Sequence, residues 1–109
     1  MSYKITPTPT FKKQAKTLLK KYKSLQTELA ILGKNLSENP IYGSALGRNC
    51  YKIRLSIKSK GKGKSGGARI ITHVLVTHEE VLLLTIYDKK VKPDLEPNEL
   101  TDLLKEVKP

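Results

Sequence analysis

The chain has 109 residues, of which 21 are Lys or Arg and 10 are Asp or Glu, so its formal net charge at pH 7 is +11. This length favours a single domain, spanning 1–109, with a modest hydrophobic core. The strong positive charge favours a polyanionic partner, such as a nucleic acid or the ribosome, over a surface that serves solubility alone. The single cysteine, Cys50, excludes an internal disulfide, and we expect it to pack as a small hydrophobe.

The sequence does not indicate secretion or membrane insertion. Residues 1–4 lack an apolar signal core, and the longest apolar run, 81–84, is far too short to span a bilayer. We therefore expect a cytoplasmic protein that has no membrane partner.

The N-terminal part of the chain is predicted to form a short strand, residues 3–7, followed by helix. After the turn formers Pro7 and Pro9, apolar residues recur at steps of three and four, with lysines between them. These residues are Phe11, Ala15, Leu18, Tyr22, Leu25, Leu29 and Leu32. The stripe alone fits one long helix or a hairpin, but Ser24, as an N-cap followed by Glu28, favours a break near residues 22–24.

The second half is predicted to form a sheet. Asn39-Pro40 and Gly43 end the helical region, and residues 40–49 are expected to form a loop. Strands are predicted at 51–58, 68–77 and 81–87, with a Gly- and Lys-rich loop at 59–67 and a short helix at 98–107. The fold class is therefore α+β: a small antiparallel sheet of about four strands, backed by an N-terminal helical hairpin, with a short C-terminal helix.

The first two of these strands are predicted to form a hairpin. An apolar face shared by both strands requires paired positions whose residue numbers have an odd sum. A sum near 127 suits the loop and pairs Ile57 with Ile70 and Ile53 with Val74. This register puts Lys58 beside Arg69, and Arg54 near His73, on the other face. Facing cations are destabilising, which favours an anion site over a solvated face.

The third strand and the loop extend this pattern. Leu82, Leu84 and Ile86 share one parity and are assigned to the core, whereas Tyr87 takes the basic face. Gly63-Lys64-Ser65 is not a nucleotide-binding P-loop, because the required glycine four residues earlier is absent and a strand follows. The glycines instead allow the backbone to turn and present amide groups to phosphate.

Three segments of the predicted sheet carry a recognisable pattern: Cys50-Tyr51-Lys52-Ile53-Arg54-Leu55, Gly63-Lys64-Ser65-Gly66-Gly67-Ala68-Arg69-Ile70-Ile71 and Leu84-Thr85-Ile86-Tyr87-Asp88-Lys89-Lys90. Together they resemble the RelE/ParE toxin superfamily, and the run from Gly63 to Arg69 is similar to its HigB-like branch. The resemblance implies an antiparallel sheet backed by two helices, neutralisation by a cognate antitoxin protein and, in the RelE and HigB branches, cleavage of mRNA in the ribosomal A site. It also implies contact with ribosomal RNA.

The resemblance also implies site residues, carried over by position. Lys52, Arg54 and Arg69 match the basic residues of the family's sheet, and Lys90 stands where RelE proteins tend to have arginine. RelE proteins use a tyrosine in the C-terminal segment, but residues 93–109 contain none, so Tyr87 is the nearby candidate. With Lys58, these residues form the predicted catalytic set, and the predicted RNA- and ribosome-binding set is Lys60, Lys62, Lys64, Ser65, Lys89 and Lys92.

RNA cleavage by attack of the 2′-hydroxyl on the adjacent phosphate needs neither metal nor small-molecule cofactor, and we expect none here. Arg54 and Arg69 suit the phosphorane, Lys52 or Lys58 could act as base if neighbouring cations lower its pKa, and Tyr87 could orient the RNA. Asp88 and Asp94 stand alone in the sequence, which disfavours a metal site. Two other functions stay open: a non-enzymatic ParE-type inhibitor of DNA gyrase, and a basic RNA- or ribosome-binding module.

Overall fold

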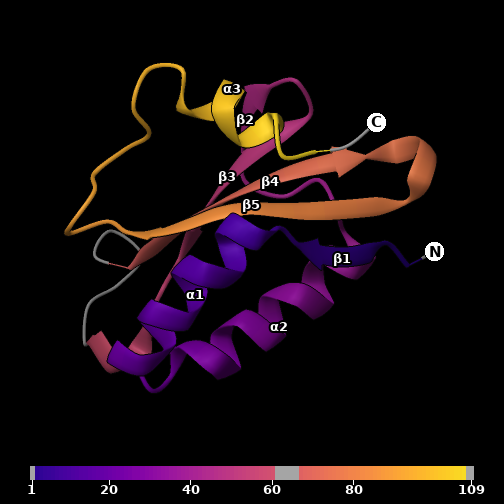
Figure 1. The fold of residues 1–109 in the computed structure, drawn as a ribbon. Coiled ribbons are helices and arrows are strands. Elements are labelled where there is room, and N and C mark those ends of the chain that lie inside the picture. Colours follow the sequence, from indigo (N-terminus) through magenta and orange to yellow (C-terminus); the bar gives the residue numbers. More distant parts are fainter. Residues whose placement is uncertain (1, 61–66, 108–109) are drawn as a thin grey trace.

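A mixed sheet of five strands, in the order β1-β5-β4-β3-β2, runs through the part of the chain that the computed structural model describes, residues 2–60 and 67–107 (Figure 1). Helices α1 and α2 cover one face of this sheet, and α3 lies on the other. The strands are β1 (Lys4–Pro7), β2 (Ser44–Gly47), β3 (Cys50–Leu55), β4 (Ala68–Leu75) and β5 (Glu80–Asp88). The helices are α1 (Pro9–Lys21), α2 (Leu25–Glu38) and α3 (Glu99–Leu104), with short 3-10 turns η1 (Lys58–Lys60) and η3 (Val76–His78).

The predicted helical hairpin is confirmed, with its break where the sequence indicated. Pro9 begins α1, where a missing N–H costs nothing, and the Thr8 side chain accepts a hydrogen bond from the Phe11 N–H. Ser24 precedes α2 as predicted, but its hydroxyl donates to the Glu28 side chain at 3.1 Å instead of capping the backbone. None of the described helices has the length and apolar character that a membrane crossing requires.

The sheet differs from the predicted antiparallel sheet in two ways. Strand β1 lies parallel to β5, with Ile5 opposite Val81, so the sheet is mixed. A further strand, β2, lies inside the predicted loop 40–49. Neither feature is visible in local periodicity, because β1 and its partner are far apart in sequence and β2 is too short and exposed to show alternation.

The pairing of β3 with β4 has the predicted parity, but the predicted register is wrong. Ile53 lies opposite Ile70 and Arg54 lies opposite Arg69. Lys58 is therefore not beside Arg69. The cause is that β3 ends at Leu55, earlier than predicted, and the 3-10 turn η1 begins at Lys58.

A bulge in β5 divides its apolar residues between the two faces. Ile71 pairs with Thr85 and the next residue of β4 pairs with Leu83, which leaves Leu84 as the additional residue. Leu84 packs in the cluster around α3, whereas Ile86 packs with the core beneath α1 and α2. The single core face predicted for β5 is therefore wrong, and both faces of this strand are buried.

Candidate functional site

Four polar side chains form a row on the face of the sheet turned away from α1 and α2. Arg54, Arg69 and Tyr87 occupy directly opposed positions on β3, β4 and β5. Lys52 precedes Arg54 by two residues and shares its face, because side chains alternate along a strand. We call Lys52, Arg54, Arg69 and Tyr87 the basic row. The sheet brings together four of the six predicted catalytic residues.

The cations of the basic row have different surroundings. Arg54 is exposed, and within residues 2–60 and 67–107 no carboxylate pairs with it. Arg69 is only 5% exposed, and its Nη1 donates to the Ala68 carbonyl at 3.1 Å. Lys52 Nζ lies 3.6 Å from an Asp94 carboxylate oxygen. Arg54 is therefore the cation of the row that is best placed to meet an anion from solvent.

Tyr87 occupies the most enclosed end of the row. Its side chain is 6% exposed, and its hydroxyl is buried with no hydrogen-bond partner among the described residues. Burial, together with the charges of Asp94 and Glu99, raises the pKa of Tyr87 to about 12, although Arg69 acts in the opposite direction. The phenol therefore keeps its proton near neutral pH and can donate a hydrogen bond, but it cannot act there as a base.

The segment between β5 and α3 folds over this end of the row. Lys92 forms an ion pair with Glu99, and its Nζ lies 5.4 Å from the centroid of the Tyr87 ring. Lys89 Nζ donates to the Pro93 carbonyl at 2.9 Å. Asp94, which stands alone in the sequence, reaches Lys52. Two predicted RNA-binding lysines, at positions 89 and 92, thus have partners within the protein itself.

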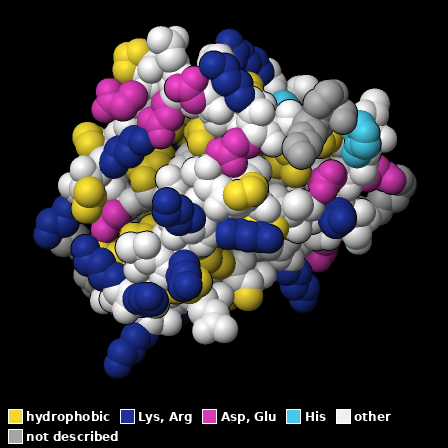
Figure 2. All heavy atoms as spheres, in the orientation of Figure 1, with side chains coloured by type: hydrophobic (Ala, Val, Ile, Leu, Met, Phe, Trp, Pro, Cys, Tyr) yellow, Lys and Arg dark blue, Asp and Glu magenta, His cyan; other side chains and the backbone are white. Residues whose placement is uncertain are grey.

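The surface charges are unevenly distributed. Acidic side chains gather over the segment before α3 and over α3 itself, whereas Lys and Arg side chains spread over α1 and the neighbouring surface (Figure 2). No acidic residue lies in the first turn of α1, and Lys20 and Lys21 occupy its last turn. The positive charge is therefore not confined to the basic row.

The remaining predicted site residues lie away from the row or outside the described chain. Lys58 begins η1, four residues beyond Arg54, and its N–H donates to Glu28 of α2 at 2.6 Å. Lys90 is exposed in the turn after β5, and its N–H donates to Asp88 at 3.0 Å. The side chain of Lys60, and the whole of Lys62, Lys64 and Ser65, lie outside the described residues.

Two features of the site were not predicted from the sequence. The Tyr22 hydroxyl, at the end of α1, donates to the buried Asp88 carboxylate at 2.6 Å and so ties the helix to the strand end beside Tyr87. Tyr42 lines a polar hollow of about 450 Å³ together with Lys52 and Arg54. Neither feature could be deduced from the spacing of apolar residues in a strand or helix. The one signal in the sequence was for Tyr42, since an aromatic residue in a predicted loop is a candidate for binding.

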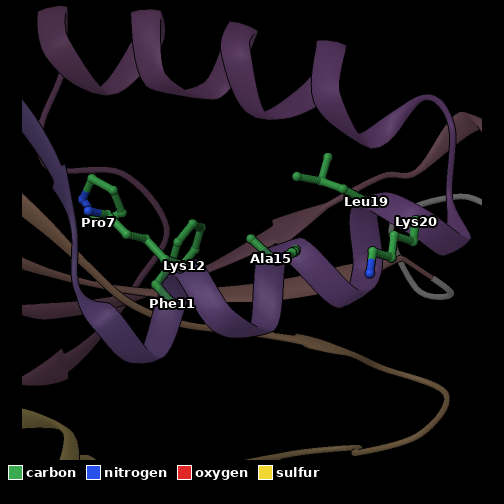
Figure 3. A pocket seen from close by; sticks show the side chains of 7 residues that line it. Pro7, Phe11, Lys12, Ala15, Leu19 and Lys20 are labelled. Carbon is green, nitrogen blue, oxygen red and sulfur yellow. The ribbon is translucent and has the colours of Figure 1, made fainter.

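A second hollow of similar size, about 450 Å³, runs along α1. Apolar side chains, including Phe11, Ala15 and Leu19, form its floor, and lysines such as Lys12 and Lys20 border it (Figure 3). It lies on the helical layer, not on the strand positions that carry the basic row.

Cys50 packs as the sequence predicted. Its side chain is fully buried, with Sγ 3.4 Å from His73 Nδ1. Burial raises the pKa of the Cys50 thiol to about 11, which removes it as a nucleophile near neutral pH. Among the residues that the structure describes, no three His, Cys, Asp or Glu side chains come together in a group that could hold a metal ion.

The fold was compared with known proteins. No family model matches the sequence. A mutant of the Escherichia coli toxin RelE, solved in the free state, superposes with a TM-score of 0.64 at 16% sequence identity, covering 99% of this chain and 100% of that one. The HigB-like branch stays a prediction, since this comparison does not distinguish it. The chain therefore has the fold of the RelE toxin, and the resemblance to the RelE/ParE superfamily that the sequence predicts is confirmed at the level of the fold.

Proposed function

We propose that this protein is the toxin of a type II toxin–antitoxin pair and that it inhibits translation by cutting mRNA in the ribosomal A site. Its partners would be mRNA, ribosomal RNA and a cognate antitoxin protein, and it would act in the cytoplasm. The observation that carries the proposal is the direct opposition of Arg54 and Arg69 on neighbouring strands, in line with Tyr87. Cations on directly opposed strand positions favour the binding of an anion near them, and the phosphate of RNA is such an anion.

The proposed reaction is transfer of the phosphate to the adjacent 2′-oxygen. The 2′-oxygen forms a bond to phosphorus, the bond from phosphorus to the 5′-oxygen breaks, and a cyclic phosphate and a free 5′-hydroxyl result. Arg54 and Arg69 stabilise the negative charge of the phosphorane, because guanidinium groups stay charged and bind two oxygens at once.

Two protons move in this reaction. Tyr87, with a pKa raised to about 12, keeps its proton near neutral pH; it donates a hydrogen bond to the departing 5′-oxygen and transfers that proton as the bond to phosphorus breaks. Lys52 is better placed than Lys58 to receive the 2′-hydroxyl proton, since it lies in the basic row. In the free protein Lys52 is an ammonium group paired with Asp94, so it must leave Asp94 and release a proton to solvent before its amine can take up the 2′-hydroxyl proton.

The residues of the basic row differ in burial, and this difference implies an order in which they would meet the RNA phosphate. Arg69 and Tyr87 are almost fully enclosed, and Arg54 is exposed. In this proposal Arg54 meets the phosphate first, and Arg69 and Tyr87 engage it once the segment between β5 and α3 moves aside.

The test is to add the protein to translating ribosomes and map the 5′ ends of the mRNA. New ends that carry a 5′-hydroxyl are expected with the wild type, and Arg54→Gln should cut roughly 10²- to 10³-fold more slowly, as expected for loss of one group that stabilises the transition state. Lys16→Gln is the matched control, because it removes one charge from the exposed face of α1. Growth inhibition without new ends would overturn the nuclease proposal in favour of a ParE-type or purely binding mode.

The Gly- and Lys-rich loop can be tested separately. If Lys60, Lys62 and Lys64 contact phosphates, replacing all three with Gln should lower the salt dependence of single-stranded RNA binding by about 2 in log–log slope, at about 0.7 for each contact. An unchanged slope would remove the loop from the RNA-binding surface.

A further inference from the structure

A polar hollow of about 450 Å³ lies at the exposed end of the basic row, near the edge of the sheet. Its lining comes from two neighbouring strands and the residues just before them: Tyr42, Gly43, Ser44, Lys52 and Arg54. Ser44 of β2 pairs with Lys52 of β3, so the hollow is built on the sheet itself. It therefore adjoins the one cation of the row, Arg54, that is open to solvent.

The chain before β2 is held against this edge by a close backbone approach at Gly43. Gly43 has φ +102, and a Cβ at this position would lie 2.4 Å from the Lys52 carbonyl oxygen. Only glycine permits both the conformation and the contact. The backbone next to Tyr42 is therefore fixed relative to Lys52, and the ring is held beside the hollow.

Tyr42 differs from the other tyrosines in its exposure. All five tyrosines lie within the described residues, and Tyr42, at 43% exposure, is the most open to solvent of them, since the other four are buried or half-buried. Tyr42 also lines a smaller hollow of about 200 Å³ against α2, which Arg54 lines as well. One aromatic surface thus faces solvent beside an unpaired guanidinium group.

We propose that Tyr42 stacks on a nucleobase of the RNA strand whose phosphate is bound by Arg54 and Lys52. The inference rests on the proposed function, since it takes the basic row as the RNA site, and it adds a residue that positions the strand. Single-stranded RNA is held by this combination of an aromatic ring for the base and cations for the backbone. Stacking is tolerant of base identity, so Tyr42 fixes the location of a nucleotide more than its type.

The experiment measures binding of a short single-stranded RNA, and of the same RNA with one abasic position, to the wild type and to variants of Tyr42. Tyr42→Ala should weaken binding of the intact RNA roughly 5- to 150-fold, the range measured for loss of one stacked base. Tyr42→Phe should retain wild-type affinity, because the ring is kept. Ile41→Ala is the matched control, since Ile41 is the adjacent residue and is 57% exposed.

The abasic RNA separates stacking from a structural effect. With the base removed at the position that Tyr42 contacts, the wild type should lose the same factor that Tyr42→Ala loses on intact RNA, and Tyr42→Ala should lose nothing further. Equal binding by the wild type and Tyr42→Ala would overturn the inference, as would equal losses for Tyr42→Ala and Ile41→Ala. Tyr42-dependent binding without any mRNA cleavage on ribosomes would instead refute the nuclease proposal and leave the stacking role in place.

Discussion

Replacing Gly67 with Ala tests the register that places Arg54 opposite Arg69. Gly67 comes directly before β4, and a Cβ there would lie 1.9 Å from the Leu55 carbonyl oxygen and 2.9 Å from its carbon. These are backbone atoms, so no side-chain movement relieves the contact. The ends of β3 and β4 must separate where Leu55 pairs with Ala68.

The cost of this separation follows from the bonds it breaks. The Leu55–Ala68 pairing is lost, together with the hydrogen bond from Lys89 N–H to the Gly67 carbonyl at 3.1 Å. Each hydrogen bond contributes about 1 kcal/mol, and the buried groups left behind raise the total to about 2–4 kcal/mol. For a domain of this size, the melting temperature should fall by roughly 10–20 °C.

The matched control is Gly33→Ala, which makes the same chemical change in the interior of α2. A Cβ at Gly33 would meet no atom within 4 Å. Alanine is favoured over glycine in a helix by roughly 0.5–1 kcal/mol, so this variant should melt a few degrees higher than the wild type.

Thermal unfolding followed by circular dichroism, with urea unfolding as a second measurement, checks both variants. A Gly67→Ala protein that melts within about 2 °C of the wild type would refute the close approach of the strand ends, and with it the argument for the register. A Gly33→Ala protein that is destabilised would show that the difference between the two sites has been misjudged.

Four further outcomes are expected. Stability of the wild type should fall as pH rises from about 10, the ordinary pKa of tyrosine, towards the pKa of about 12 of folded Tyr87, because the unfolded chain loses the phenol proton first. Tyr87→Phe should lack this part of the decline and, at neutral pH, should be at least as stable as the wild type, since it removes a buried hydroxyl that has no partner among the described residues. Tyr22→Phe should lower the free energy of unfolding by about 1.5–3 kcal/mol in urea titrations, because it removes a hydrogen bond to the buried Asp88 carboxylate. Asp94→Asn should change the free energy of unfolding by less than about 1 kcal/mol, since the Asp94 side chain is 67% exposed. The same variant should bind RNA more tightly at low salt, because Lys52 loses its ion-pair partner. Unchanged RNA binding would argue against Lys52 in the RNA site.

The elements that the sequence predicted well are those with strong local patterns. The apolar stripe from Phe11 to Leu32 predicted both helices, and alternation around Ile53 predicted β3 and the face on which Lys52 and Arg54 lie. The parity of the hairpin was correct for the same reason, since a shift by one residue would have buried the lysine and arginine of β3.

The errors concern distances along the chain that no local pattern fixes. The length of β3 could not be deduced, because Ile57 continues the alternation and is fully buried although it lies beyond the strand. Taking Ile57 as part of the strand led to a predicted pairing of Ile57 with Ile70, whereas Ile53 is the residue that lies opposite Ile70. The bulge at Leu84 likewise leaves no mark on a continuous apolar run, because both faces of β5 are buried.

The candidate site was predicted in part for a similar reason. The sequence placed Arg54, Arg69 and Tyr87 on one face of the sheet, because side chains alternate along a strand and the parity of the pairing was correct. The ion pair of Lys52 with Asp94 depends on how an irregular segment folds back, and irregular segments have no period.

The parallel pairing of β1 with β5 has a consequence for folding during translation. Thr6 donates a hydrogen bond to Glu80, and Thr8 N–H donates to the Leu83 carbonyl, so the first strand acquires its partner only after β5, which follows it by 74 residues at the Thr6–Glu80 contact, has been made. Contacts this far apart in sequence form late and slowly, because closing the intervening chain costs entropy before any contact repays it. The nascent chain therefore cannot pair β1 until residue 83 has emerged, and the basic row is assembled only slightly later, when Tyr87 of β5 reaches Arg69.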